Sequence, residues 1–210
     1  EIWDVTKTLL SNAFKKYNPK NCAGIGITNQ RETTLIWNKK NDKPIYNAIV
    51  WQCRRTESIC KKIKSSKDAR KFSDKTGLVI DSYFSATKIK WLLDNIDGAK
   101  TLAKKGDLAF GTIDTWILWK LTNGKTHATD HTNASRTLIY NIDELTWDNE
   151  LLSILKIPKE ILPKVKKSCY NFGTTNLKFL KKSIPITGIA GDQQAALYGQ
   201  GCIKPGDTKC

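Results

Sequence analysis

An arginine and a glutamate stand side by side in the stretch "GITNQRETT", which runs from Gly26 to Thr34. They follow the apolar run "AGIGI", so Arg31 and Glu32 are predicted to lie where a strand gives way to a turn. A guanidinium donates hydrogen bonds and a carboxylate accepts them, so the pair has the chemistry to hold a small polar molecule. A salt bridge and a solvated loop are the plainer alternatives, and this stretch alone leaves all three open.

A second residue whose type and position suggest a chemical role is Asp192, in the segment "GIAGDQQAALYGQG". The pattern predicts a strand that runs into Gly191 and a helix that begins at Asp192. The positive end of a helix keeps such a carboxylate ionised, so that it can hold a metal ion or accept a proton. Ligands of open α/β sheets sit at the carboxyl ends of strands, where this residue is expected. From the residues alone, a simple helix cap is the commoner role for such an aspartate.

Two aromatic residues occur where the chain leaves an apolar segment or enters a helix. Trp51 lies in "VWQCRRT", between an expected strand and polar residues, and its ring can wall a pocket or belong to the core. Tyr83 lies in "DSYFSATK", in an expected loop before a helix, and is unremarkable by itself. Neither residue identifies a site without its neighbours.

The composition is that of an ordinary globular domain, with 40% hydrophobic and 26% charged residues in 210. No apolar run approaches about 18 residues, and the first ten residues do not read as a signal peptide. The net charge of +15 comes mostly from scattered lysines, whereas nucleic-acid readers favour arginine. Six cysteines and two histidines show no zinc spacing, so reduced thiols in a cytoplasmic protein are expected.

Helical and strand patterns alternate along the chain, which predicts an α/β domain. A first helix is expected over "IWDVTKTLLSNAFKKY", where Ile2, Val5, Leu9, Leu10 and Phe14 are apolar at helical spacing. Further helices are expected from 54 to 66, after a cap at Ser85 or Thr87, and in "DTWILWKL". A last one is expected between a cap at Asp148 and Pro158. Strands are expected in "NCAGIGIT", which reads as buried, in "TTLIWNKKNDKPIYNAIVW" as two strands around a turn, in "DLAFG", and in "SIPITGIAG".

Five segments taken together resemble one family. They are "GITNQRETTLIW", "NAIVWQCRRT", "SYFSATKIKWLLDN", "GTIDTWILWKLTNGKTHATDHTNASRT" and "IPITGIAGDQQAALYGQ". In this order they resemble the glycerol kinases, a branch of the carbohydrate kinases that share the actin/Hsp70-like (ribonuclease H-like) ATPase fold. The resemblance implies an incomplete domain of that fold, with a mixed sheet and flanking helices.

The resemblance also implies roles for individual residues. Arg31 and Glu32 are expected to bind the hydroxyl groups of glycerol, while Trp51 and Tyr83 provide an aromatic wall and a further hydroxyl contact. Asp192 is expected to act as the catalytic base near Mg²⁺, and Gln193 to contact the substrate. The implied reaction converts ATP and glycerol to ADP and sn-glycerol 3-phosphate. The rival hypotheses are another polyol or sugar kinase, a non-catalytic relative, and a basic nucleic-acid-binding module.

Compared with that family, residues 1–190 resemble most of the N-terminal, substrate-binding domain without its first strand hairpin. Residues 191–210 are expected to form a linker helix that leads towards an absent C-terminal domain. ATP would then bind mainly through regions outside this chain, so the 210 residues alone are expected to be inactive and less stable than an intact domain. The parent protein is expected to be a cytoplasmic homodimer or homotetramer with no nucleic-acid partner and no stable membrane insertion.

Overall fold

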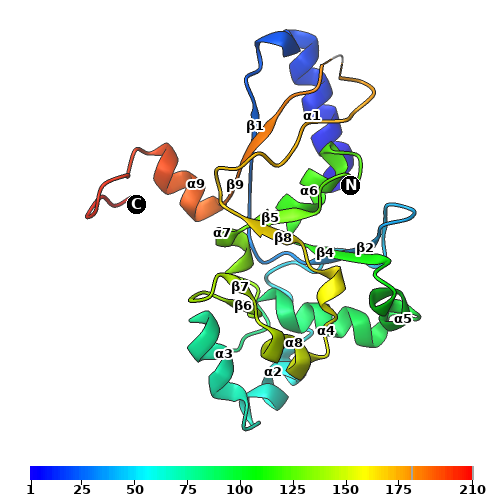
Figure 1. Cartoon of the computed structure of the whole chain (residues 1–210), viewed down its shortest axis with the longest axis vertical. Helices are drawn as coiled ribbons and strands as arrows, with labels where there is room; N and C mark the ends of the chain where they lie inside the picture. Colours follow the sequence, from blue (N-terminus) through cyan, green and yellow to red (C-terminus); the bar gives the residue numbers. More distant parts are fainter. Residues whose placement is uncertain (181, 210) are drawn as a thin grey trace.

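The computed structural model describes residues 1–180 and 182–209, and it confirms an α/β fold with helices flanking strands (Figure 1). The α-helices are α1 (Ile2–Lys16), α2 (Glu57–Lys64), α3 (Ala69–Thr76), α4 (Ser85–Asn95), α5 (Ala99–Lys104), α6 (Ile113–Leu121), α7 (His131–Ala134), α8 (Asn149–Leu155) and α9 (Asp192–Gly199). The strands are β1 (Ile25–Asn29), β2 (Leu35–Asn38), β3 (Lys43–Pro44), β4 (Leu108–Gly111), β5 (Ala128–Asp130), β6 (Tyr140–Asn141), β7 (Thr146–Trp147), β8 (Lys164–Lys166) and β9 (Ile186–Gly191).

The strands form several small groups with both parallel and antiparallel pairing. β1 pairs with β9 and β5 with β8 in parallel, whereas β2 lies antiparallel between β3 and β4. β6 and β7 form a separate antiparallel pair. In Figure 1 the β1–β9 pair lies beside α1 at one end of the molecule, and α2, α3 and α8 gather at the other.

The β1–β9 pair determines which residues meet. Its parallel register places Asn29 opposite Gly191, although the two residues are far apart in the sequence. Both strands therefore end at the same edge, and the chain continues from there to Arg31 on one side and Asp192 on the other. The expectation that β1 is fully buried is wrong, because Gly26 and Thr28 are exposed while the alternate residues pack towards α6.

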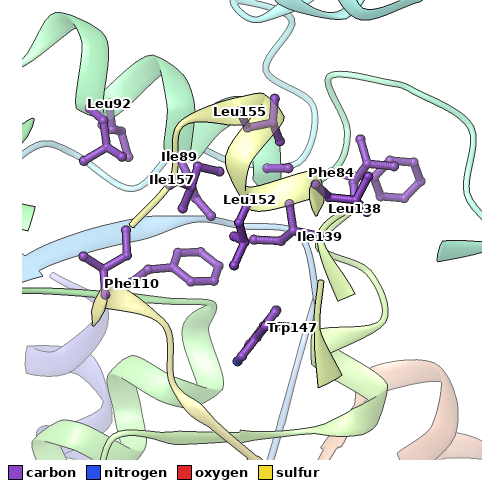
Figure 2. Close-up of a cluster of buried hydrophobic side chains, with 14 of the residues drawn as sticks. Phe84, Ile89, Leu92, Phe110, Leu138, Ile139, Trp147, Leu152, Leu155 and Ile157 are labelled. Atoms are coloured by element: carbon purple, nitrogen blue, oxygen red, sulfur yellow. The ribbon is translucent and has the colours of Figure 1, made fainter. Parts of the chain in front are cut away.

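Two apolar clusters hold these elements in place. The larger joins α4 and α8 to β4 and the β6–β7 pair (Figure 2); it includes Phe84, Ile89, Leu92, Phe110, Leu138, Ile139, Trp147, Leu152, Leu155 and Ile157. The smaller lies beneath β1 and β9 and is built around Trp37, whose ring lies 5.2 Å from that of Trp116 and 5.8 Å from that of Trp119. Burying large rings removes much apolar area from water, so each cluster fixes the helices that contribute to it.

Helix ends agree with the sequence in some places and differ in others. Asp148 caps α8 by accepting from the backbone N–H groups of Glu150 and Leu151, as predicted. The expected Ser85 or Thr87 cap of α4 is wrong, because the cap position is Phe84 and it makes no side-chain cap bond. Thr87 is instead buried, and its hydroxyl shares a 2.8 Å hydrogen bond with the hydroxyl of Thr56. This tertiary contact occupies the group that would otherwise cap the helix.

The first helix forms as expected, but only part of its predicted apolar set faces the core. Ile2, Val5 and Leu9 are exposed, whereas Leu10 of that set packs against the smaller apolar cluster together with Trp3. Both groups have helical spacing, so the periodicity alone did not distinguish which residues point inward. Across the described residues, the helices are too short or too polar to cross a membrane.

The burial of His127 makes the folding stability depend on pH. The His127 ring lies 5.5 Å from the ring of Trp37, and its Nε2 is 2.8 Å from the carbonyl oxygen of Phe110. Burial disfavours the charged form and lowers the pKa of His127 from 6.5 to about 4. Folding stability from this residue is therefore complete above pH 6.5 and is lost as the pH falls from 6.5 towards 4.

We predict that His127→Gln removes this acid-dependent loss, which amounts to at most about 3 kcal/mol for a pKa difference of this size. The measurement is the free energy of unfolding in urea between pH 4 and 7 for the wild type and the variant. The same substitution at His131, the other histidine, is the control. Parallel pH curves for the wild type and His127→Gln would show that burial of His127 does not produce the effect.

Candidate functional site

The ends of β1 and β9 bring Arg31 and Asp192 to the same edge of the strand pair. Arg31 Nε lies 3.9 Å from Asp192 Oδ1, with the two side chains 13% and 51% exposed. This Nε is buried, and within residues 1–180 and 182–209 it has no hydrogen-bond acceptor. Buried donors normally find a partner, so Arg31 presents an unsatisfied N–H beside a half-exposed carboxylate.

Asp192 is the first residue of α9, and Gly191 occupies the cap position. Its carboxylate is therefore not the N-cap that the residue type alone favoured. Oδ1 accepts from the backbone N–H of the next residue, Gln193, at 2.8 Å, while the carboxylate remains open to solvent. Gln193 is exposed, and it contributes its backbone N–H to this cluster.

Gly191 allows Arg31 to approach the strand end closely. A Cβ atom added to Gly191 would overlap Arg31 Cδ and lie 2.8 Å from Cγ. The Gly191 N–H donates to Thr132 Oγ1 at 2.7 Å, and Thr132 in turn donates to Asp130 Oδ2 at 2.7 Å. The residue before Asp192 is thus held by α7, and it must be small for Arg31 to keep its position.

A buried polar network lies beneath the two strand ends. Asn29 at the end of β1 donates to Asn133 Oδ1 at 3.0 Å and to Asp114 Oδ1 at 3.2 Å. Asn133 donates to Asp130 Oδ1 at 2.8 Å, which joins β1 to the same aspartate that holds Thr132. Burial raises the pKa of Asp114 to about 6, and the hydroxyl donors of Thr112 and Thr129 oppose that shift. The network fixes the backbone from which Arg31 and Asp192 project.

Glu32 points away from solvent and is held by two cations. Its side chain is 5% exposed, and its Oε1 accepts from Arg136 Nε at 2.7 Å. The Lys88 ammonium is fully buried and donates at 2.8 Å to the backbone carbonyls of both Glu32 and Tyr83. Burial lowers the pKa of Lys88 to about 8, while the charge of Glu32 opposes that change. Lys88 therefore joins the backbone at Glu32 to the backbone at Tyr83.

Trp51 and Tyr83 form an aromatic pair next to Glu32. Their ring centroids are 5.7 Å apart with the planes at 65°, an edge-to-face arrangement. The Arg136 guanidinium lies 5.7 Å from the Tyr83 ring and 4.9 Å from the Phe84 ring. Burial, followed by the charge of Glu32, raises the pKa of Tyr83, so its hydroxyl stays protonated as a hydrogen-bond donor.

The structure thus places the predicted residues in two adjoining groups. Arg31 and Asp192 form one, and Glu32, Tyr83 and Trp51 form the other; they adjoin because Arg31 and Glu32 are consecutive. Together they offer donors, acceptors and an aromatic surface for a small hydroxylated molecule, with an open carboxylate able to take a proton.

At this site the Asp192 carboxylate is the side chain placed to act as a metal ligand. Over the described residues, His, Cys, Asp and Glu side chains form no cluster of three or more that could hold a metal ion. The single half-exposed carboxylate of Asp192 suits Mg²⁺, which proteins often bind through one or two carboxylates plus substrate phosphates and water.

Sequence reasoning missed Arg136, Lys88 and the Asp130–Thr132 pair. Arg136 and Lys88 lie inside two of the quoted segments, "HTNASRT" and "YFSATK", but neither was assigned a role. The available signal was a lysine among apolar residues of a helix, since Lys88 precedes Ile89 and follows Ala86 and Thr87. A buried lysine needs a partner, so its position in the helix pointed to a carbonyl or carboxylate nearby.

Comparison with known proteins gives a consistent set of relatives. Residues 1–199 match the model of the FGGY family of carbohydrate kinases, N-terminal domain. A glycerol kinase of Halothermothrix orenii is 59% identical over 212 residues, which cover all of this chain and 42% of that protein. Glycerol kinase 1 of Clostridium tetani is 56% identical over 211 residues, again 100% of this chain and 42% of the relative. The chain therefore spans about two-fifths of the length of these relatives.

Solved structures agree with the fold. The crystal structure of Plasmodium falciparum glycerol kinase with ADP superposes with a TM-score of 0.81 at 42% identity, covering 85% of this chain and 36% of that one. A ligand-bound xylulose kinase from Lactobacillus acidophilus gives a TM-score of 0.84 at 26% identity, covering 96% and 41%.

We predict that Gly191→Ala displaces the Arg31 side chain, because the new methyl group would occupy its place. The backbone of Gly191 has φ of −59°, which alanine adopts readily, so the fold should persist. Crystal structures should show the guanidinium outside ion-pair distance of Asp192. Gly26→Ala is the matched control, since its added Cβ meets nothing within 4 Å. An undisturbed Arg31 in the Gly191→Ala variant would contradict the close-approach argument.

Proposed function

The chain belongs to the FGGY family of carbohydrate kinases, and on that premise we propose that the full-length protein transfers a phosphoryl group from ATP to glycerol. The observation that carries the proposal is the unsatisfied Arg31 Nε, 3.9 Å from the half-exposed Asp192 carboxylate and adjacent in sequence to Glu32. The names of several relatives at 55–59% identity, all glycerol kinases, support the choice of alcohol.

In the proposed complex, Arg31 donates to one glycerol oxygen and Glu32 accepts from a hydroxyl group. Trp51 and Tyr83 cover the carbon chain, the Tyr83 hydroxyl adds a polar contact, and Gln193 contacts the alcohol from the start of α9. A site that pairs its buried polar groups with substrate hydroxyls discriminates strongly against analogues that lack one.

Asp192 is the proposed base. As the terminal glycerol oxygen attacks the γ-phosphorus of ATP, its proton passes to the Asp192 carboxylate, and the bond from phosphorus to the bridging oxygen of ADP breaks. Asp192 would hold Mg²⁺, which would neutralise negative charge on the phosphates. The remaining contribution of the chain is to hold the alcohol in line, which Arg31 and Glu32 accomplish by fixing its hydroxyl groups.

The phosphoryl donor is a cytoplasmic metabolite, and we therefore propose a cytoplasmic location. A kinase for a related sugar is the second candidate, because a xylulose kinase and a gluconate kinase share this fold at 26% identity. The relatives with more than 50% identity support glycerol over these sugars.

For the full-length protein we predict that Asp192→Asn lowers kcat for glycerol by about 10²–10⁴-fold, since an amide cannot take the proton. The KM for glycerol should stay within a few-fold, because Arg31 and Glu32 still bind the alcohol. A coupled assay of ADP release measures both constants. Asp74→Asn, on an exposed residue of α3, is the control. An unchanged kcat for Asp192→Asn would rule out this residue as the base.

We also predict that glycerol gives the highest kcat/KM in a panel that includes xylulose, gluconate and other polyols. Glu32→Gln should lower kcat/KM for glycerol, since the amide presents a donor in place of one acceptor oxygen. If xylulose or gluconate were turned over with higher kcat/KM, the sugar-kinase alternative would replace the glycerol assignment.

A further inference from the structure

Arg136 joins two parts of the proposed site that come from distant segments. It follows α7, and its Nε donates to Glu32 Oε1 at 2.7 Å. Its guanidinium also lies over the rings of Tyr83, at 5.7 Å, and Phe84, at 4.9 Å. The same side chain thus touches the carboxylate and the aromatic hydroxyl-bearing ring that are proposed to meet the alcohol.

The ion pair uses only one oxygen of Glu32. Arg136 Nε binds Oε1, whereas Oε2 is not engaged by that guanidinium, and the Tyr83 hydroxyl lies near the same carboxylate. The Glu32 side chain is 5% exposed, so its carboxylate is not completely enclosed by the protein. Arg136 consequently selects which oxygen of an otherwise buried carboxylate faces a ligand.

We infer that Arg136 is a positioning residue, which aims Glu32 and Tyr83 at the alcohol and thereby sets the preference for glycerol over diols that lack a hydroxyl group. This inference rests on the proposed function. Arg136 acts through Glu32 and Tyr83 in this scheme, and no contact between Arg136 and the substrate is required.

The backbone around these residues is held independently of Arg136. Lys88 donates to the carbonyl oxygens of both Glu32 and Tyr83 at 2.8 Å, and it lies within α4, whose buried residues belong to the larger apolar cluster. Removing the Arg136 side chain should therefore free the side chains of Glu32 and Tyr83 while their backbones remain in place. A loss of positioning can then be separated from a loss of fold.

A lysine at position 136 would reproduce only part of this arrangement. The guanidinium is planar, so it can lie against an aromatic ring while its edge donates to a carboxylate. An ammonium group keeps the charge but lacks that flat surface. Arg136→Lys should be intermediate between the wild type and Arg136→Met.

The test measures kcat and KM of the full-length protein with glycerol, 1,2-propanediol and 1,3-propanediol. Arg136→Met should lower kcat/KM for glycerol about 30–100-fold, as expected for a lost charge-assisted hydrogen bond. For the diol that lacks the hydroxyl bound by Glu32, the decrease should be under about threefold. The KM for ATP should not change by more than about twofold. Equal decreases for glycerol and both diols would overturn the inference.

A double-mutant cycle tests whether Arg136 acts through Glu32. If it does, Arg136→Met added to Glu32→Gln should lower kcat/KM for glycerol by no more than about threefold beyond Glu32→Gln alone. Independent, multiplicative effects would overturn the inference. Arg70→Met, at an exposed residue of α3, is the control for loss of an arginine, and thermal unfolding checks the fold of each variant.

The activity of the wild-type protein in the same assay distinguishes failure of the proposed function from failure of the inference about Arg136. Turnover of glycerol by the wild type with equal losses for all three alcohols in Arg136→Met would leave the proposed function standing and remove the role of Arg136. Absence of glycerol turnover by the wild type would remove both. If Arg136→Met does not fold, the substrate dependence of Arg136→Lys decides the question by the same criterion.

Discussion

The parallel pairing of β1 with β9 is the constraint on which the candidate site depends. It aligns Asn29 with Gly191, so the two chain segments leave the strand pair together and place Arg31 within 3.9 Å of Asp192. A shift of one residue in this register would turn every side chain to the opposite face and separate the guanidinium from the carboxylate. The smaller apolar cluster under these strands and the Asn29 hydrogen bonds to Asn133 and Asp114 both oppose such a shift.

Two buried charged groups near the site, Glu32 and Lys88, have close partners that strongly restrict their geometry. Glu32 is 5% exposed and bound to Arg136, and Lys88 is fully buried with two carbonyl partners. Removing Arg136 would leave the buried Glu32 carboxylate without its charge partner, which is unfavourable because burial penalises an unpaired charge. Such pairs contribute little net stability, but they restrict Glu32 and Tyr83 to one arrangement. Preorganisation of this kind favours recognition of a small, rigidly placed alcohol.

Local features of this fold could be read from the sequence, whereas long-range contacts could not. The strand in "DLAFG", the helix in "DTWILWKL" and the Asp148 cap depend on neighbouring residues, and all three were predicted. The ion pair between Glu32 and Arg136 spans 104 residues, so no spacing rule exposes it. The Ser85 or Thr87 cap was wrong for the same reason, since packing against Thr56 lies outside the local pattern. Arg31, Glu32 and Asp192 were singled out by residue type and position, but their proximity was expected only from the family resemblance.

A crystal structure of the full-length protein with glycerol tests the central claim most directly. We predict one hydroxyl oxygen within about 3 Å of the Arg31 guanidinium, another within that distance of Glu32 Oε2, and a terminal oxygen at hydrogen-bond distance from the Asp192 carboxylate. Glycerol bound with its terminal oxygens remote from Asp192, or in a place that excludes both Arg31 and Glu32, would contradict it.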